Sequence, residues 1–326
     1  MTPIEAQYRG TVNRIAAALL LFLGLFQLMG LAIGFLPLFL GNCTPRTADV
    51  IYELAYGLLY ATVFVIPVLF YAWLSRRKPH ASIDLALNLP SDTPLYIFAG
   101  IAVILAAAYF NSLIVEVFHY SSFSDEVLWD TDVTCNYQLV LQFFTMAVVP
   151  AFVEELLFRG MVLQNLLPYG RTSAVLASSL LFGAMHQNAG QLLYATVAGV
   201  VLGLIYVKTR SFWCCVLLHF CNNFFSIFQM AIYERMPNAV GASVVRISEC
   251  TMLALGLFSA VVLLRREKVS REEALQTDIP AQAETLVCTI SPRRKLTLFC
   301  SVPMIIFFAL CAVQMVIYLL IAFLLY

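Results

Sequence analysis

Long apolar runs recur along the whole chain, and they constrain its fold more than any other feature. A helix needs about 20 mostly apolar residues to cross the hydrocarbon core of a bilayer. Of the 326 residues 61% are hydrophobic and only 12% are charged, whereas a soluble domain carries about 25% charged residues. We therefore predict an all-α fold, a polytopic transmembrane helix bundle of about nine spans. The nine runs cover residues 13–40, 50–74, 94–117, 137–166, 172–187, 190–208, 212–233, 242–264 and 297–325.

The runs divide the chain into three parts. Residues 1–136 hold the first three spans and an acidic loop. Residues 137–233 hold the fourth to seventh spans, and we expect these to form the functional core. Residues 234–326 hold the eighth span, a polar loop from Glu267 to Ser291, and an accessory ninth span. Within the fourth span, Pro150 is expected to kink the helix.

Basic residues predict the orientation, because cytoplasmic loops are enriched in Lys and Arg. With nine spans the basic loops all fall on one side, and the acidic loop near residues 125–132 falls on the other. We therefore expect a multi-pass membrane protein with its N-terminus inside and its C-terminus outside. Cys43 and Cys135 would share the outer side, as a disulfide or as two free thiols. The net charge of zero gives no sign of a nucleic-acid partner. The inner basic residues are Arg9, Arg14, Arg76, Arg77, Lys78, Arg171, Lys208, Arg210, Arg265, Arg266, Lys268, Arg293, Arg294 and Lys295.

Ionisable residues inside a span are costly and suggest a functional site. In the fourth span Glu155 and Arg159 lie four residues apart, so they share a helix face and can pair. Glu154 points about 100° away from Glu155 on a helix of 3.6 residues per turn and has no local partner. A carboxylate in such a setting suits proton transfer.

Three further polar residues lie in neighbouring spans: His186 in the fifth, and His219 and Asn223, four residues apart, in the seventh. Counting from the inner ends of their spans, Glu154, His186 and His219 lie at heights of about 18, 22 and 14 Å. Antiparallel helices thus bring these groups to one level. Taken singly, each group also has a structural interpretation: a packing histidine, a structural ion pair, or an asparagine between helices. Their common level favours a functional site.

The pattern EExxxR, FxxxH and HxxxN resembles the CPBP family (CAAX protease and bacteriocin-processing), in particular the type II CAAX prenyl endopeptidases. The motifs are Glu154–Arg159, Phe182–His186 and His219–Asn223, and they occupy the fourth to seventh spans. The resemblance implies an intramembrane endopeptidase that cuts a peptide bond near the membrane surface. Its partners would be membrane lipid and a peptide or protein substrate, prenylated or not.

The resemblance also implies roles for the residues. Glu154, helped by His186, would be the general base for a water molecule, and His219 and Asn223 would donate hydrogen bonds to the oxyanion. Arg159 would hold Glu155 in a supporting pair. In a zinc-dependent version Glu154, His186 and His219 would ligate the metal. We expect no cofactor, because the Asn223 amide is a poor zinc ligand and a good oxyanion donor.

Two other classes of function stay open at this point. A non-catalytic membrane protein, such as an immunity or scaffold protein, could keep the polar site as structure. A proton-coupled carrier could use Glu154 and His186 as a relay. Carriers commonly show inverted repeats and broken helix pairs, and neither is clear in this sequence, so we expect the peptidase.

Overall fold

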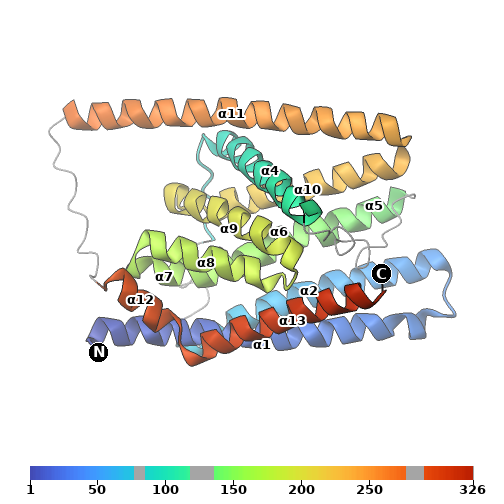
Figure 1. Cartoon of the computed structure of the whole chain (residues 1–326), viewed down its shortest axis with the longest axis horizontal. Helices are drawn as coiled ribbons and strands as arrows, with labels where there is room; N and C mark the ends of the chain where they lie inside the picture. The colour runs from blue at the N-terminus through green and yellow to red at the C-terminus, as the bar shows by residue number, and fades with distance from the viewer. Residues whose placement is uncertain (77–84, 118–135, 277–289, 326) are drawn as a thin grey trace.

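The computed structural model describes residues 1–76, 85–117, 136–276 and 290–325, and within these ranges every regular element is helical (Figure 1). The all-α, polytopic fold is thereby confirmed. Eight helices of the described part are long and apolar enough to cross a membrane. The elements are α1 (Pro3–Leu40), α2 (Pro45–Leu74), α4 (Thr93–Val117), α5 (Asn136–Gln142), η2 (Phe143–Val148), α6 (Val149–Glu155), η3 (Leu156–Leu163), α7 (Gln164–Leu166), η4 (Leu167–Tyr169), α8 (Arg171–Met185), α9 (Ala189–Thr209), α10 (Phe212–Arg235), α11 (Asn238–Gln276), α12 (Pro292–Phe299) and α13 (Val302–Leu325).

The fifth expected span, residues 172–187, is as short as its apolar run predicts. Its helix, α8, has 15 residues and is about 22 Å long at 1.5 Å per residue, less than the roughly 30 Å of a hydrocarbon core. It nevertheless packs along α9 as the first arm of a helical hairpin. Gly183 and Gly199 permit the close packing, because a Cβ at Gly199 would lie 2.9 Å from the Ser179 Cα and one at Gly183 would overlap Thr196 Oγ1.

The helices run side by side, with the α8–α9 hairpin in the middle of the view (Figure 1). The pair α1 and α2 packs on one side, and α13 lies along α1. On the opposite side α11 packs against α4, which in turn contacts α9 and α10. The N-terminus and α12 lie at one end of the bundle, and the loop between α1 and α2 lies at the other (Figure 1).

The fourth span is interrupted rather than simply kinked. The α-helical segment α6 lies between two π-helical segments, η2 and η3. Pro150 stands in the first turn of α6, where its missing N–H and fixed φ disturb the preceding turn. π-helical turns within α-helices are found mostly at functional sites. Here they flank the segment that carries Glu154 and Glu155.

The eighth helix extends further than expected. α11 continues to Gln276, so the first ten residues of the predicted polar loop from Glu267 are helical. Glu, Arg, Ala and Leu are strong helix formers, and they dominate this part of the sequence. The rest of that loop, the acidic loop near residues 125–132 and Cys135 lie outside the described residues.

Candidate functional site

A buried triad joins two helices at the centre of the site. Arg159 Nη1 donates to Glu155 Oε1 at 2.9 Å, and the same oxygen lies 2.9 Å from His219 Nδ1 on α10. Arg159 Nη2 also donates to the Gly199 carbonyl of α9 at 3.0 Å. Glu155 and Arg159 are fully buried, and His219 is 7% exposed. The expected ion pair between Glu155 and Arg159 is therefore present, and it also holds the histidine.

The triad defines the tautomer of His219. A carboxylate oxygen accepts hydrogen bonds, so the proton on this ring lies on Nδ1 and points at Glu155. Nε2 then faces the other carboxylate, with Glu154 Oε2 at 3.9 Å. That distance is too long for a direct hydrogen bond. It suits a group that bonds to both atoms, such as a water molecule.

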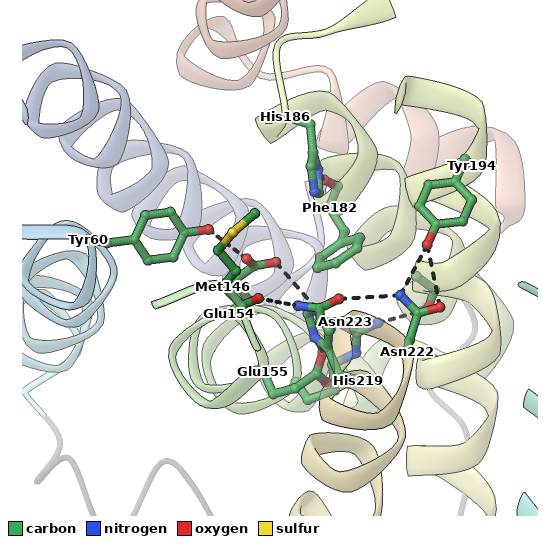
Figure 2. A network of polar contacts seen from close by, with 12 residues as sticks. Tyr60, Met146, Glu154, Glu155, Phe182, His186, Tyr194, His219, Asn222 and Asn223 are labelled. Atoms are coloured by element: carbon green, nitrogen blue, oxygen red, sulfur yellow. Dashed lines mark hydrogen bonds and ion pairs between the residues drawn. The ribbon is translucent and has the colours of Figure 1, made fainter. Parts of the chain in front are cut away.

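Glu154 is held by a helix outside the predicted core. Tyr60 on α2 donates to Glu154 Oε1 at 2.6 Å, while Glu154 Oε2 is buried without a hydrogen bond. Only 4% of this residue is exposed. Figure 2 shows Tyr60 and His219 approaching the carboxylate from different sides. One oxygen is thus fixed, and the other is oriented toward the imidazole.

The formal charges of the four buried groups cancel only when one of them takes up a proton. Glu154, Glu155 and Arg159 together carry a formal charge of −1 when His219 is neutral, and protonation of His219 brings the sum to zero. Burial of uncompensated charge is costly. One proton added at the facing atoms His219 Nε2 and Glu154 Oε2 would therefore cancel the formal charge of the group. Uptake of a proton is a step that acid–base chemistry requires.

Asn223 is positioned by the interruption of the fourth span. Its Nδ2 donates to the Met146 carbonyl at 3.2 Å, and Pro150, four residues after Met146, has no N–H to offer that carbonyl. The amide carries two N–H donors, so one stays available for a ligand. Its Oδ1 accepts from Asn222 Nδ2 at 3.3 Å. His219 and Asn223 thus both contact the fourth span, as their spacing of four residues suggests.

His186 lies apart from the Glu154 carboxylate (Figure 2). Its Nδ1 donates to the Phe182 carbonyl at 2.8 Å, and its ring packs edge-on against Phe182 at 5.2 Å. The Phe182 ring also contacts His219, with centroids 5.9 Å apart. Within the described residues no hydrogen bond or ion pair joins His186 to Glu154. The Nε2 of His186 is therefore free to act, while its link to Glu154 stays a prediction.

The donor set does not match a zinc site. In the described part of the chain, no three His, Cys, Asp or Glu side chains cluster closely enough to hold a metal ion. Glu154 and His219 approach each other, but the third expected ligand, His186, lies apart from the Glu154 carboxylate (Figure 2). A protein zinc site needs at least three such ligands. We therefore derive no step through a metal.

The sequence interpretation did not include two residues that the structure places in this network. Tyr60 contacts Glu154, and Tyr194 OH accepts from Asn222 Nδ2 at 3.0 Å (Figure 2). For Tyr60 a signal existed, because Tyr52, Tyr56 and Tyr60 repeat every four residues and so mark one face of α2. Tyr194 has no comparable pattern around it.

Comparison with known proteins identifies a family match over the part of the chain that carries the three motifs. Residues 136–225 match the family model described as Type II CAAX prenyl endopeptidase Rce1-like. The match includes all six candidate residues of the three motifs, and it confirms the resemblance inferred from them. The Bacillus subtilis (strain 168) protein named "Putative membrane peptidase YdiL" is 29% identical over 90 residues, which are 27% of this chain and 36% of that protein. The chain thus spans about a third of the length of this relative. No solved structure matches the chain.

Proposed function

We propose that this membrane protein is an intramembrane endopeptidase in which Glu154 activates a water molecule. The observation that carries the proposal is the approach of Glu154 Oε2 to His219 Nε2, 3.9 Å apart and from different helices. The two atoms can share one water molecule and one proton. The similarity of residues 136–225 to type II CAAX prenyl endopeptidases supports peptide hydrolysis as the reaction.

The proposed reaction begins with a proton transfer from water to Glu154. The water oxygen attacks the scissile carbonyl carbon, and the carbonyl oxygen takes up the negative charge. When His219 carries a proton on both ring nitrogens, its Nε2–H and the second N–H of Asn223 donate to this oxyanion, and each donor is typically worth a few kcal/mol of barrier lowering. The C–N bond then breaks, and Glu154 returns its proton to the leaving amine.

The supporting residues keep this geometry in place. Glu155, bound to Arg159, holds His219 Nδ1 and so directs Nε2 toward Glu154. Tyr60 fixes the other oxygen of Glu154. We propose that His186, whose Nε2 is free, orients the water or the substrate from the far side of the Phe182 ring. We also propose that no metal takes part, because the donor set lacks a third ligand.

The proposal requires processing that depends on Glu154. Wild type and Glu154→Gln are expressed in the native host, and new N- and C-termini of membrane peptides are compared by mass spectrometry. Glu154→Gln keeps the shape of the side chain but cannot accept the proton, so termini that need this protein should be lost. Identical termini in the two strains, with equal amounts of folded protein, would contradict the proposal.

The same pair of strains distinguishes the non-catalytic alternative. An immunity or scaffold protein would keep its partner binding or protection in Glu154→Gln, because the variant leaves the surface and the fold unchanged. A peptidase would lose its cellular effect together with the processed termini.

A further inference from the structure

A further carboxylate within the spans lies on α2, outside the proposed reaction. Glu53 accepts from Thr145 Oγ1 of η2 at 2.8 Å. One turn earlier on the same face, Asp49 accepts from Tyr137 OH of α5 at 2.8 Å. A carboxylate within a span normally faces the bundle interior or water. Here both acidic groups point at the fourth span.

Two tyrosines on the same face of α2 extend this row of polar side chains to the candidate site. Tyr56 follows Glu53 on the same helix face and stacks on Tyr60 with ring centroids 5.8 Å apart. Tyr60 then donates to Glu154. We call Asp49, Glu53, Tyr56 and Tyr60 the α2 polar strip. It covers 11 residue steps, about 16 Å of helix, from the beginning of α2 to the catalytic carboxylate.

The opposite direction from Glu154 is closed by apolar packing. Leu157 and Phe158 of η3, and Cys215 and Leu218 of α10, have no solvent exposure. The polar group that lies beyond them, Arg159, is itself fully buried and held by Glu155 and the Gly199 carbonyl. A continuous series of polar side chains thus leads from the site toward one end of the bundle, and apolar packing blocks the other.

The end of the short α8 faces the same open end of the bundle. Its turn into α9 falls well short of the end of the bundle that carries the α1–α2 loop (Figure 1). His186 and Asn188 in this turn are partly exposed, and Asn188 Oδ1 accepts from the Gly190 N–H at 2.8 Å. Irregular backbone at membrane depth occurs only where protein covers it or water reaches it. The turn therefore fits a hydrated region next to Glu154.

The basic residues identify the side of the membrane to which this end belongs. Arg171 begins α8, and Lys208 and Arg210 lie between α9 and α10. Arg293 and Arg294 lie on α12, at the same end as the N-terminus (Figure 1). All of these are at the end away from the beginning of α2. By the positive-inside rule that basic end faces the cytoplasm, so the polar strip begins on the outer side.

We propose that water and substrate reach Glu154 from the outer side of the membrane, along the α2 polar strip. The substrate class that fits is a membrane peptide whose cleavage site lies in the outer half of the bilayer. A lipid-modified C-terminus at the inner surface would lie on the closed side. The substrate part of this inference rests on the proposed peptidase function, whereas the route itself does not.

Thiol labelling tests the route. Full-length Glu53→Cys and Tyr56→Cys proteins are exposed, in right-side-out and in inverted vesicles, to a charged methanethiosulfonate reagent that does not cross membranes. Modified peptides are then identified by mass spectrometry. Leu54→Cys is the matched control, because Leu54 is 61% exposed at the same depth and points away from the bundle. The native Cys43 and Cys300, near opposite ends of the bundle, report which side the reagent reaches.

The expected result is that Glu53→Cys, Tyr56→Cys and Cys43 are modified in right-side-out vesicles and Leu54→Cys is not, since the reagent needs a hydrated thiolate. Modification of the strip positions only in inverted vesicles would overturn the inference. The inference would also be overturned if Glu53→Cys and Tyr56→Cys were labelled no more than Leu54→Cys, in proteins that size-exclusion chromatography shows to be folded. The same labelling can be carried out in the Glu154→Gln variant, because it does not depend on catalysis. Outer labelling without Glu154-dependent cleavage would therefore keep the route and reject the peptidase.

Discussion

The imidazole of His219 is held by Glu155 and not by Glu154, the neighbour of Glu155 in the sequence. His219 Nδ1 lies 2.9 Å from Glu155 Oε1, on the oxygen that Arg159 also contacts. The ring orientation is therefore fixed from the closed side of the site. A histidine fixed through one nitrogen presents the other in a defined direction, and here that direction is toward Glu154.

Replacement of Glu155 should reduce catalysis more than binding. In Glu155→Gln the amide no longer offers a charged acceptor to both Arg159 and His219, so the imidazole is less well oriented. By analogy with other residues that orient a functional histidine, we expect kcat to fall about 10–100-fold with little change in KM. The measurement is steady-state kinetics on a peptide whose cleavage depends on Glu154. A change in KM alone would show that Glu155 serves the substrate and not His219.

Removal of Arg159 should destabilise the fold. Arg159→Met leaves Glu155 as a buried charge without its cation, and breaking a buried pair in this way costs about 3–5 kcal/mol. Lys208→Ala is the matched surface case, because its partner Glu267 and Lys208 itself are both about half exposed, and such pairs contribute about 0–1 kcal/mol. Thermal unfolding in detergent, followed by size-exclusion chromatography, compares the two. Equal losses of stability would contradict the structural role of the triad.

The sequence predicts the parts of this site that depend on one helix. Helical spacing alone indicates the ion pair of Glu155 with Arg159 and the shared face of His219 and Asn223, and the structure contains both. Contacts between helices depend on rotation and tilt, which hydropathy does not define. That is why the bond from Tyr60 to Glu154 was not predicted. The short α8, by contrast, matches its apolar run of residues 172–187.

Tyr60 should matter for catalysis through its hydroxyl group. Tyr60→Phe keeps the ring and removes the 2.6 Å hydrogen bond to Glu154 Oε1. A hydrogen bond to a charged group is worth about 1.5–3 kcal/mol, so we expect kcat to fall about 10- to 100-fold. Tyr52→Phe is the control, since Tyr52 belongs to the same helix repeat but is 37% exposed and lies about two turns of α2 before Tyr60. Equal rates for Tyr60→Phe and wild type would remove Tyr60 from the site.

Metal removal should leave the activity intact. The expected zinc ligands Glu154, His186 and His219 do not form a three-ligand cluster, so a chelator has no catalytic ion to extract. The purified protein is dialysed against a chelator, its metal content is determined by mass spectrometry, and cleavage is measured before and after. Activity that is lost and then restored by zinc alone would establish the metal-dependent mechanism instead.

Asn223 and Asn222 should differ in function although they are neighbours. Asn223 Nδ2 donates to the Met146 carbonyl and keeps a second N–H, whereas Asn222 pairs with Tyr194 on α9. Removal of an oxyanion donor costs about 10²–10³ in kcat, so Asn223→Ala should show that loss with nearly unchanged KM. Asn222→Ala should instead lose the bond between helices, worth about 0.6 kcal/mol in membrane proteins, and the bond to Asn223 Oδ1, but no oxyanion donor. Kinetics and thermal stability are measured on both variants. Similar kcat values in the two would mean that Asn223, like Asn222, only joins helices, and the oxyanion would then depend on His219 alone.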